Sequence, residues 1–241
     1  MAKSSRMFHK VTRTWNPITG CLHYCVYCWA RRLAEGRLRN TRKYSDGFKP
    51  KFHPEELSKR FKPGEFVFVA DMGDMWGDWV PKQWILQVLE VIRKYPKTTF
   101  LLLTKNTKRY LKFAGFLKGL PNVILGATVE TDDSDLYKSY RISKAEAPFS
   151  RLIDMSYLSI CRDMKVMLSI EPILNFNMEN FVNWIADIKP EFVYVGYDNY
   201  NNKLPEPPLH KTMELIDQLK EHGITVYTKT LRKAWYEVQG P

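Results

Sequence analysis

The sequence is poor in the features that mark a membrane or secreted protein. No apolar run approaches the roughly 18 residues that a membrane-spanning helix needs. The basic start, Met1–Arg6, has no apolar segment behind it, which argues against a secretory signal. Cysteine is scarce, and three of the four cysteines lie within eight residues, which does not make a disulfide framework. We therefore expect a protein of the reducing cytoplasm that has no membrane partner and keeps its thiols for a metal.

Acidic residues are also few relative to basic ones. The chain has 37 Lys and Arg against 26 Asp and Glu, which gives a formal net charge of +11 and a pI near 9.4. An excess of this size favours polyanionic partners, with nucleic acid first among them. Many lysine-rich soluble proteins bind no nucleic acid, so charge alone leaves this partner open. The arginine-rich segment 31–43 allows two interpretations as well, a solvated helix face or a phosphate-binding rim beside the cysteines.

What is present is enough apolar sequence for a packed core. Hydrophobic residues make up 44% and aromatic residues 14% of the 241 residues, a length that suits one domain spanning residues 1–241. Short runs rich in β-branched and aromatic residues alternate with amphipathic helical patterns, which predicts an α/β fold with a parallel sheet in a full or partial barrel. The expected strands are 8–15, 66–70, 99–104, 123–129, 165–170, 191–196 and 224–228. The expected helices are 29–38, 54–60, 81–95, 107–118, 132–140, 152–161, 177–188 and 209–222.

The three clustered cysteines, Cys21, Cys25 and Cys28, are the strongest functional signal in the chain. Their spacing is Cys-x3-Cys-x2-Cys, and a turn at residues 17–20 places them in a loop. A loop lets three thiolates converge, whereas a helix would fan them around its axis. Iron–sulfur clusters commonly take four cysteine ligands, so three cysteines predict a cluster with one iron open to another ligand. The alternative is zinc with His23 as the fourth ligand, although structural zinc sites generally use two ligand pairs separated by a longer loop.

Charged and hydrogen-bonding side chains follow six of the seven expected strands. In βα barrels the active site is built from the loops at the carboxyl ends of the strands, and the cysteine loop follows the first strand. We therefore expect these side chains on the same rim as the cysteines. The strand-end segments are 71–74, 104–106, 128–131, 171–172, 197–200 and 229–230. The aromatic residues expected at the mouth are Trp76, Trp79, Tyr197 and Tyr200.

The cysteine spacing, with the aromatic Tyr27 directly before the third cysteine, resembles the signature of the radical S-adenosylmethionine (SAM) enzymes. A wider resemblance is to a small, phage-protein-like radical SAM family of prokaryotes and phages. It rests on TWNPITGC (14–21), LLTK (102–105), LGATVE (125–130), SIEP (169–172), YVG (194–196) and VYTK (226–229). The chain departs from that family in its arginine-rich insertion and at Tyr197-Asp198-Asn199, where the family has a Gly-Glu-Ser type of turn. The resemblance implies a partial (βα)6-type TIM barrel.

The resemblance also implies roles for individual residues. Cys21, Cys25 and Cys28 would ligate three irons of a [4Fe–4S] cluster, and SAM would chelate the open iron. Tyr27 would lie against the adenine of SAM. The other candidates to bind SAM are Met72, Gly73 and Asp74, in the place of the superfamily's Gly-Gly-Glu motif, together with Thr104, Lys105, Thr128, Glu130 and Glu171. The candidate catalytic residues are Tyr197, as a radical relay for which Tyr200 is the alternative, and Lys229.

Cys161, the remaining cysteine, could in principle donate a hydrogen atom in a radical reaction. It is expected between a helix and the strand that follows, which is the face opposite the cluster in a βα barrel. We therefore interpret Cys161 as a small buried hydrophobic residue.

By resemblance, the reaction is reductive cleavage of SAM, with an external one-electron reductant, to a 5′-deoxyadenosyl radical that abstracts hydrogen from a substrate. The net charge and the arginines near the cysteine loop favour nucleic acid as that substrate, in a modification or lesion-repair reaction. A peptide or small-molecule substrate with an incidental basic surface is the second hypothesis. A zinc-bound nucleic-acid-binding module without catalysis is the third.

Overall fold

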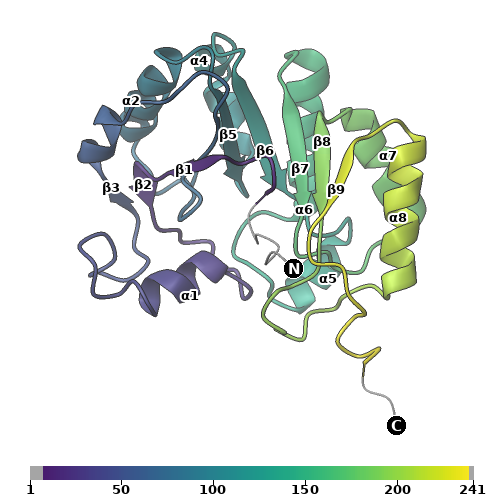
Figure 1. Cartoon of the computed structure of the whole chain (residues 1–241). Coiled ribbons are helices and arrows are strands. Elements are labelled where there is room, and N and C mark those ends of the chain that lie inside the picture. Colours follow the sequence, from purple (N-terminus) through teal and green to yellow (C-terminus); the bar gives the residue numbers. More distant parts are fainter. Residues whose placement is uncertain (1–7, 239–241) are drawn as a thin grey trace.

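A curled sheet of seven parallel strands, in the order β1-β4-β5-β6-β7-β8-β9, forms the centre of the molecule (Figure 1). The structure is a computed structural model, and it describes residues 8–238. The strands are β1 Arg13–Trp15, β4 Phe66–Val69, β5 Thr99–Thr104, β6 Val123–Thr128, β7 Val166–Ile170, β8 Phe192–Val195 and β9 Val226–Thr228. Because β1 and β9 are the two edges of this sheet, the described chain forms an open, partial barrel. The predicted α/β fold with a parallel sheet is confirmed.

Helices connect the strands, and α2, α7 and α8 lie outside the curled sheet (Figure 1). The α-helices are α1 Trp29–Glu35, α2 Lys82–Arg93, α3 Lys108–Lys112, α4 Ala114–Leu117, α5 Ser134–Ser139, α6 Pro148–Ser156, α7 Met178–Ile188 and α8 Leu209–Glu221. A 3-10 helix, η1, spans Pro54–Ser58, and a π-helical turn, η2, spans Tyr157–Cys161. Within residues 8–238, no helix is long and apolar enough to cross a membrane.

Successive side chains of each strand point to opposite faces of the sheet, which divides the apolar residues into two clusters. Val67 and Val69 of β4, for example, pack in the larger core, which also contains the buried faces of α2, α7 and α8. Phe68, between them, faces the inside of the partial barrel. The inner cluster consists of Phe8, Phe68, Leu101, Ile124, Met167, Phe192 and Tyr194.

The sequence predicts Phe8 in the first strand, 8–15, but the structure places it in the inner cluster. Its ring is 5% exposed and lies 5.6 Å from the ring of Phe68 and 4.4 Å from the ring of Tyr194. The Nζ atom of Lys229 is 4.8 Å from the centre of the same ring. The inner apolar face therefore draws Phe8 away from the sheet, and β1 shortens to Arg13–Trp15. The basic start Met1–Arg6 lies outside the described residues.

Two glycines allow the cysteine loop to lie against the loop that follows β4. The N–H of Gly20 donates to the carbonyl of Met72 at 3.0 Å, and the N–H of Asp74 donates to the carbonyl of Gly20 at 3.2 Å. Gly20 has a φ of +82°, and a Cβ on Gly73 would lie 2.9 Å from the backbone of Gly20. Contact this close requires glycine at both positions. The contact fixes the start of the cysteine loop beside Asp74.

Three local elements differ from the prediction. A short antiparallel pair joins β2 Ile18–Thr19, in the expected turn, to β3 Lys51–Phe52. The expected helix 107–118 is broken into α3 and α4 at Phe113, whose buried ring packs edge-on against Trp76 with a centroid distance of 5.5 Å. The expected helix 152–161 begins earlier, at Pro148, and ends in the π-helical turn η2.

Candidate functional site

A cavity of about 270 Å³ lies at the carboxyl ends of the parallel strands. The cysteine loop forms one side of it, and the loops that follow the strands form the other. Helices α1 and α5 lie at this same end of the sheet (Figure 1). Segments far apart in the sequence therefore meet here, as expected for the active-site end of a βα barrel. The lining includes Cys21, Cys25, Cys28, Thr104, Lys105, Thr128, Ser169, Glu171 and Lys229.

Backbone N–H groups point at two of the three half-buried thiols. The N–H of His23 donates to Sγ of Cys21 at 3.4 Å, and the N–H of Arg31 donates to Sγ of Cys28 at 3.3 Å. The second bond makes Cys28 the N-cap of α1. Hydrogen bonds to the sulfurs stabilise thiolates and are one of the ways in which proteins tune iron–sulfur clusters.

Burial acts on the same thiols in the opposite direction. It raises the pKa of Cys21 and of Cys28, because a thiolate loses hydration inside the cavity wall. The thiol of Cys25 donates to Oγ of Ser143 at 3.2 Å. A bound cation would reverse the effect of burial, since a coordinated thiol is deprotonated.

Arg31 holds the cysteine loop onto α1. Its Nη2 atom donates to the carbonyl of Cys21 at 2.8 Å, and its Nη1 atom pairs with Glu35 at 2.9 Å. The guanidinium carbon also lies 4.6 Å from the ring centre of Tyr24 and 5.2 Å from that of Phe48. The first arginine of the segment 31–43 is therefore a structural clamp for the loop.

Asp74 joins the cysteine loop to the ends of β4 and β5. Its carboxylate is 3.0 Å from Nε2 of His23 and accepts hydrogen bonds from Oγ1 of Thr104 at 2.8 Å. It also accepts from the N–H groups of Lys105 at 3.1 Å and Trp76 at 2.9 Å. Burial alone would raise the pKa of Asp74, but the bonds to His23 and the other donors outweigh it, so the pKa is lowered. The ionised carboxylate is committed to this network.

Glu130 and Arg151 form an ion pair whose side chains are both 0% exposed, with 2.8 Å between Nη1 and Oε2. The hydroxyl of Tyr27 donates to the same carboxylate, and Nζ of Lys105 lies 3.9 Å from it. Burial would raise the pKa of Glu130, but Arg151 and Lys105 outweigh it, so the pKa is lowered. Glu130 thus anchors Tyr27 from behind the cavity wall.

Glu171 and Lys229 form a second pair, and this one lines the cavity. Their Oε2 and Nζ atoms are 2.7 Å apart, with side-chain exposures of 14% and 12%. Burial raises the pKa of Glu171, and the opposing effect of Lys229 is too weak to cancel the shift. Burial therefore displaces this carboxyl of the cavity wall toward its protonated form.

The structure places most of the predicted site residues around the cavity and two of them elsewhere. Those that line it, besides the cysteines, are Tyr27, Gly73, Asp74, Thr104, Lys105, Thr128, Glu171, Tyr197 and Lys229. Met72 is instead buried in a separate cluster with Ala30 and Phe48, and Glu130 lies behind the wall.

Tyr197 borders the cavity, but its hydroxyl is directed elsewhere. It donates to the carbonyl of Pro207 at 3.0 Å and lies 2.6 Å from Oγ1 of Thr212. Tyr197 is fully buried in the larger core. Its phenolic oxygen is therefore engaged on the outer side of the sheet.

The mouth aromatics differ from the expectation. Trp76 is 0% exposed and packs against Tyr110 in the core, and Trp79 packs edge-on against His23 with a centroid distance of 4.8 Å. Neither lines the cavity. Trp29 and Tyr200 line it and are 39% and 37% exposed. Trp76 is buried because it packs against Tyr110 of α3 and against Phe113. Trp29 lines the cavity because it directly follows Cys28.

Cys161 lies away from the cavity, at the end of η2 and before β7, as expected. The expectation that it is buried is wrong, because the thiol is exposed. In this π-helical turn it is Leu158 that points inward.

Sequence reasoning assigned no role to two polar residues of the wall. Asp71 lines the cavity and accepts a hydrogen bond from Nδ2 of Asn16 at 2.6 Å, and burial raises its pKa. Ser169, on the inner face of β7, also lines it. The signal for the first was present, because Asn16 and Asp71 directly follow the strand segments at Trp15 and Ala70, which adjoin in the sheet.

The donor set fits an iron–sulfur cluster. Three thiols come from one loop and line one cavity, two of them receive backbone N–H donors, and the cavity continues from them to the strand ends. In residues 8–238, no group of three or more His, Cys, Asp or Glu side chains is placed to hold a single metal ion. His23, the candidate fourth ligand for zinc, already has Nε2 bonded to Asp74.

Comparison with known proteins identifies a family and a fold. A family model described as "Protein of unknown function (DUF5131)" matches residues 7–176. A search of curated proteins finds no match. Among solved structures, a variant of spore photoproduct lyase superposes with a TM-score of 0.61 at 11% identity, covering 95% of this chain and 80% of that one.

Two further solved structures hold SAM. Spore photoproduct lyase with bound SAM and dinucleoside spore photoproduct matches with a TM-score of 0.57 at 10% identity, over 94% of this chain and 81% of that one. SuiB of Streptococcus suis bound to SAM matches with a TM-score of 0.57 at 12% identity, over 95% of this chain and 50% of SuiB. The chain thus spans about half the length of SuiB. At these identities the likeness confirms the partial TIM barrel of the radical SAM kind.

Proposed function

We propose that this chain, which belongs to the DUF5131 family of proteins of unknown function, is a radical SAM enzyme that binds a [4Fe–4S] cluster and SAM. The observation that carries the proposal is that three thiols of one loop line a cavity at the carboxyl ends of a partial TIM barrel. The presence of SAM in solved structures of the same fold supports it. The likeness of the TWNPITGC segment to a phage-protein-like radical SAM family supports it as well.

Cys21, Cys25 and Cys28 would hold the cluster, and the backbone N–H groups at the sulfurs of Cys21 and Cys28 favour the thiolate state there. When bound, the cluster supplies the electron that breaks the C5′–S bond of SAM, so that hydrogen abstraction from a substrate can follow. The chain's own residues bind and orient the reactants and exclude water. We assign Tyr27, which Glu130 holds in place, to the adenine of SAM.

The polar wall supplies the remaining candidates to bind SAM. Gly73, Thr104, Lys105 and Thr128 lie at the ends of β4, β5 and β6, on the same cavity as the thiols. Lys105 supplies a cation there, with Nζ 5.3 Å from the ring centre of Tyr27. The carboxylate of Asp74 acts indirectly, because its hydrogen bonds keep the cysteine loop against these strand ends.

Glu171 and Lys229 lie on the strand ends that follow along the sheet, where we place the substrate side of the cavity. Nζ of Lys229 donates a hydrogen bond to Oε2 of Glu171 at 2.7 Å, and burial raises the pKa of that carboxyl. We assign the pair to positioning a substrate and to proton transfer near it. Tyr197 is the weaker catalytic candidate, because its hydroxyl is engaged with Thr212.

Nucleic acid is the substrate that we favour, in a modification or lesion-repair reaction. The support is the net charge of +11 and the basic segment beside the cysteine loop. Spore photoproduct lyase, which shares the fold, is known with a bound dinucleoside photoproduct. A peptide or small-molecule substrate is the second candidate, favoured if the basic surface proves incidental.

The test is anaerobic reconstitution with iron and sulfide, followed by reduction in the presence of SAM. The expected result is iron–sulfur charge-transfer absorption together with release of 5′-deoxyadenosine. Stoichiometric zinc without a cluster would overturn the proposal and favour the zinc-bound module.

Cysteine variants provide a matched pair for this test. Cys25→Ala removes one proposed ligand and should abolish release of 5′-deoxyadenosine, while the far-ultraviolet circular dichroism spectrum stays like that of the wild type. Cys161→Ala removes the exposed thiol at the other end of β7 and should retain the cluster and the activity. An equal loss of 5′-deoxyadenosine release in both variants would contradict the assignment of the three clustered cysteines as cluster ligands.

A further inference from the structure

Two cations beside the cavity lie over aromatic rings: Arg32 lies over Tyr200, which lines the cavity, and the N–H of Lys144 donates to the carbonyl of His23, another lining residue. Nζ of Lys144 lies 4.6 Å from the ring centre of Tyr24, in the cysteine loop. The guanidinium carbon of Arg32, on α1, lies 5.0 Å from the ring centre of Tyr200, in the loop after β8. Arg32 also donates a hydrogen bond to Oδ1 of Asn202, so it bridges α1 and this loop. Both side chains are pre-ordered, which lowers the entropy lost when they bind a ligand.

The charges of these two residues are not neutralised by the chain. Inside the cavity, Lys105 and Lys229 face the carboxylates of Glu130 and Glu171. Arg32 and Lys144 are exposed, and in the part of the chain that the structure describes neither forms an ion pair with a carboxylate. Aromatic rings fix a cation but leave its charge available, so the mouth presents two oriented positive charges.

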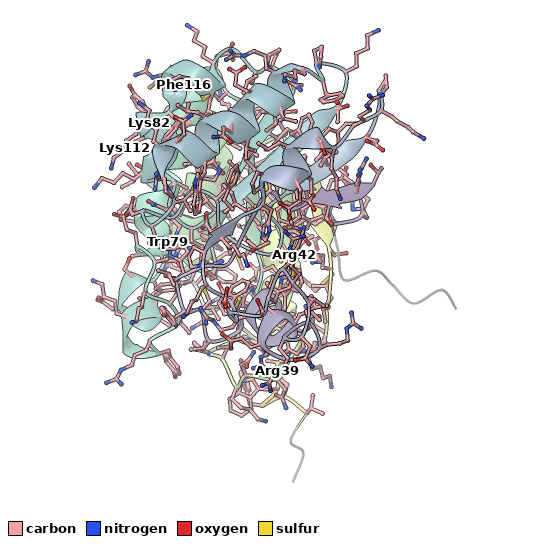
Figure 2. The ribbon with its side chains drawn as sticks, turned by 90° about the vertical axis from the view of Figure 1, so that its left-hand side faces the viewer. Arg39, Arg42, Trp79, Lys82, Lys112 and Phe116 are labelled. Carbon is pink, nitrogen blue, oxygen red and sulfur yellow. The ribbon has the colours of Figure 1, made fainter. Side chains whose placement is uncertain are left out.

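Further positive charge extends away from the mouth along α1 and the chain after it. Residues 31–51 contain eight Lys and Arg and only two acidic residues. Arg37, Arg39 and Arg42 are exposed. Figure 2 shows Arg39 and Arg42 on one side of the molecule, on the chain that follows α1. A polyanion longer than one nucleotide would therefore find basic side chains beyond the mouth as well.

Trp29 supplies an apolar platform in the cavity lining, three residues before Arg32 and therefore on the same face of α1. It is the first residue of α1, lines the cavity and is 39% exposed. Proteins that bind single-stranded nucleic acid combine exposed aromatic rings with nearby cations, because every base can stack on an aromatic face.

The position of the polar groups in the cavity decides between paired and unpaired strands. The Glu171–Lys229 pair and Ser169 lie at the ends of strands of the curled sheet and line the same cavity as Trp29 and Tyr200. A base that remains stacked in a duplex cannot reach groups in a pocket of this kind, so an enzyme must extrude it or take a single strand.

We infer that the mouth of the cavity binds an unpaired stretch of nucleic acid, with a base against Trp29 and neighbouring phosphates at Arg32 and Lys144. The inference rests on the proposed function, since it names the substrate class of the same cavity. It adds a binding surface that is built from the chain's own aromatic-held cations and that lies outside the cofactor-binding wall.

The test measures binding of the reconstituted protein to fluorescein-labelled oligonucleotides of about 12 residues, a length matched to single-strand site sizes. Single-stranded DNA, single-stranded RNA and duplex DNA are compared by anisotropy between about 50 and 200 mM KCl. We expect a single strand to bind more tightly than the duplex. The DNA and RNA arms then identify which nucleic acid is preferred.

Charge variants locate the surface. Each phosphate contact contributes about −0.7 to the slope of log K against log salt concentration for a single strand. Arg32→Gln/Lys144→Gln removes two such contacts and should therefore make the slope less negative by about 1.4. The matched control is Lys82→Gln/Lys112→Gln, which removes the same net charge. Lys82 is likewise held over an aromatic ring, with Nζ 5.6 Å from the centre of Phe116. Figure 2 shows Lys82, Lys112 and Phe116 grouped together at the far end of the molecule from Arg39, and the control should leave the slope unchanged.

The aromatic platform is tested by two substitutions. Trp29→Ala should weaken single-strand binding by roughly 5- to 150-fold, the range for loss of one stacked base. Trp29→Phe keeps a π face and should restore most of the affinity.

Four outcomes would overturn the inference. They are no binding at about 50 mM KCl, equal affinity for duplex and single strand, equal slopes in the two double variants, or competition by an acidic peptide as effective as by the oligonucleotide. Release of 5′-deoxyadenosine from SAM, measured on the same preparation, reports separately on the proposed function. Its persistence alongside any of these outcomes would reject the surface and leave the enzyme class standing.

Discussion

Two carboxylate–cation pairs follow neighbouring strands of the sheet, and they are built in opposite ways. Glu130, after β6, pairs with Arg151, and both side chains are fully buried. Glu171, after β7, pairs with Lys229 on the wall of the cavity, with 14% and 12% side-chain exposure. Burial pushes both carboxyls toward the protonated form, but only the first has enough surrounding positive charge to end with a lowered pKa. A charged side chain at a strand end can therefore stabilise the fold, when its partner is buried behind the wall, or be available for reaction, when its partner lines the cavity.

The largest expected effect is on the buried pair. Arg151→Met takes the closest cation away from the buried Glu130 and leaves Lys105, 3.9 Å away, as its remaining cationic partner, which should cost about 3–5 kcal/mol of the free energy of unfolding. Lys229→Met leaves a carboxyl whose pKa is raised even with its partner present, so it should cost less, about 1–3 kcal/mol for a buried polar group that loses its hydrogen bond. Urea unfolding of both variants and the wild type measures the difference. Equal losses would break the distinction between the pairs.

A double variant sharpens the same point. Glu130→Gln/Arg151→Met removes both charges of the pair, so its loss of unfolding free energy should be smaller than the sum of the two single losses by about 0.5–3 kcal/mol, the coupling expected for residues in direct contact. The wild type, both single variants and the double variant form a cycle that is measured in urea. Additive losses would show that the pair contributes nothing beyond its separate side chains.

The sequence could predict the sheet because its signal is local. The run Thr99–Thr104 is apolar and lies between two helical patterns, and β5 has those same bounds. Parallel pairing then follows from the alternation of strands and helices, and it brings the strand ends to one rim. That the three cysteines and Lys229 would line one cavity was predictable on these grounds alone.

The direction of individual side chains could not be predicted in the same way. Tyr197 and Glu130 follow their strands as expected, but their polar atoms bond to Thr212 and Arg151, which come from helices on the outer side of the sheet. Arg151 precedes the expected helix 152–161 by one residue, and only the tertiary fold shows that it is buried. Trp76 likewise does not line the cavity, because its ring packs edge-on against Tyr110 in the core.

A smaller effect on stability, with a larger one on activity, is expected at the cavity pair. Lys229→Met should reduce release of 5′-deoxyadenosine or turnover of a nucleic-acid substrate at least tenfold, because it removes a buried hydrogen-bonded charge from the wall. Lys229→Arg keeps the charge and should retain more activity than Lys229→Met. A variant with normal turnover would place Lys229 among the structural cations, with Arg151.

The smallest expected effect is a difference in pH dependence between the two carboxyls. The pKa of Glu171 is raised on folding, so between its unfolded and folded values the native state binds more protons, and stability falls as pH rises through this window. Glu171→Gln removes this titrating carboxyl, so the free energy of unfolding of the variant should rise relative to that of the wild type as pH rises through the same window. The pKa of Glu130 is lowered, so its contribution is present above the unfolded value and is lost as pH falls through the folded value.

Glu130→Gln should therefore be most destabilising near neutral pH and progressively less so in acid. Urea unfolding of the wild type and both variants, from about pH 7.5 down to about pH 4, tests the two signs together. Because the substitutions are chemically identical, any general effect of replacing a carboxyl by an amide cancels between them. Curves with the same sign would mean that Glu171 is as strongly paired as Glu130, and the distinction between scaffold and reactive pair would then rest on position in the cavity alone.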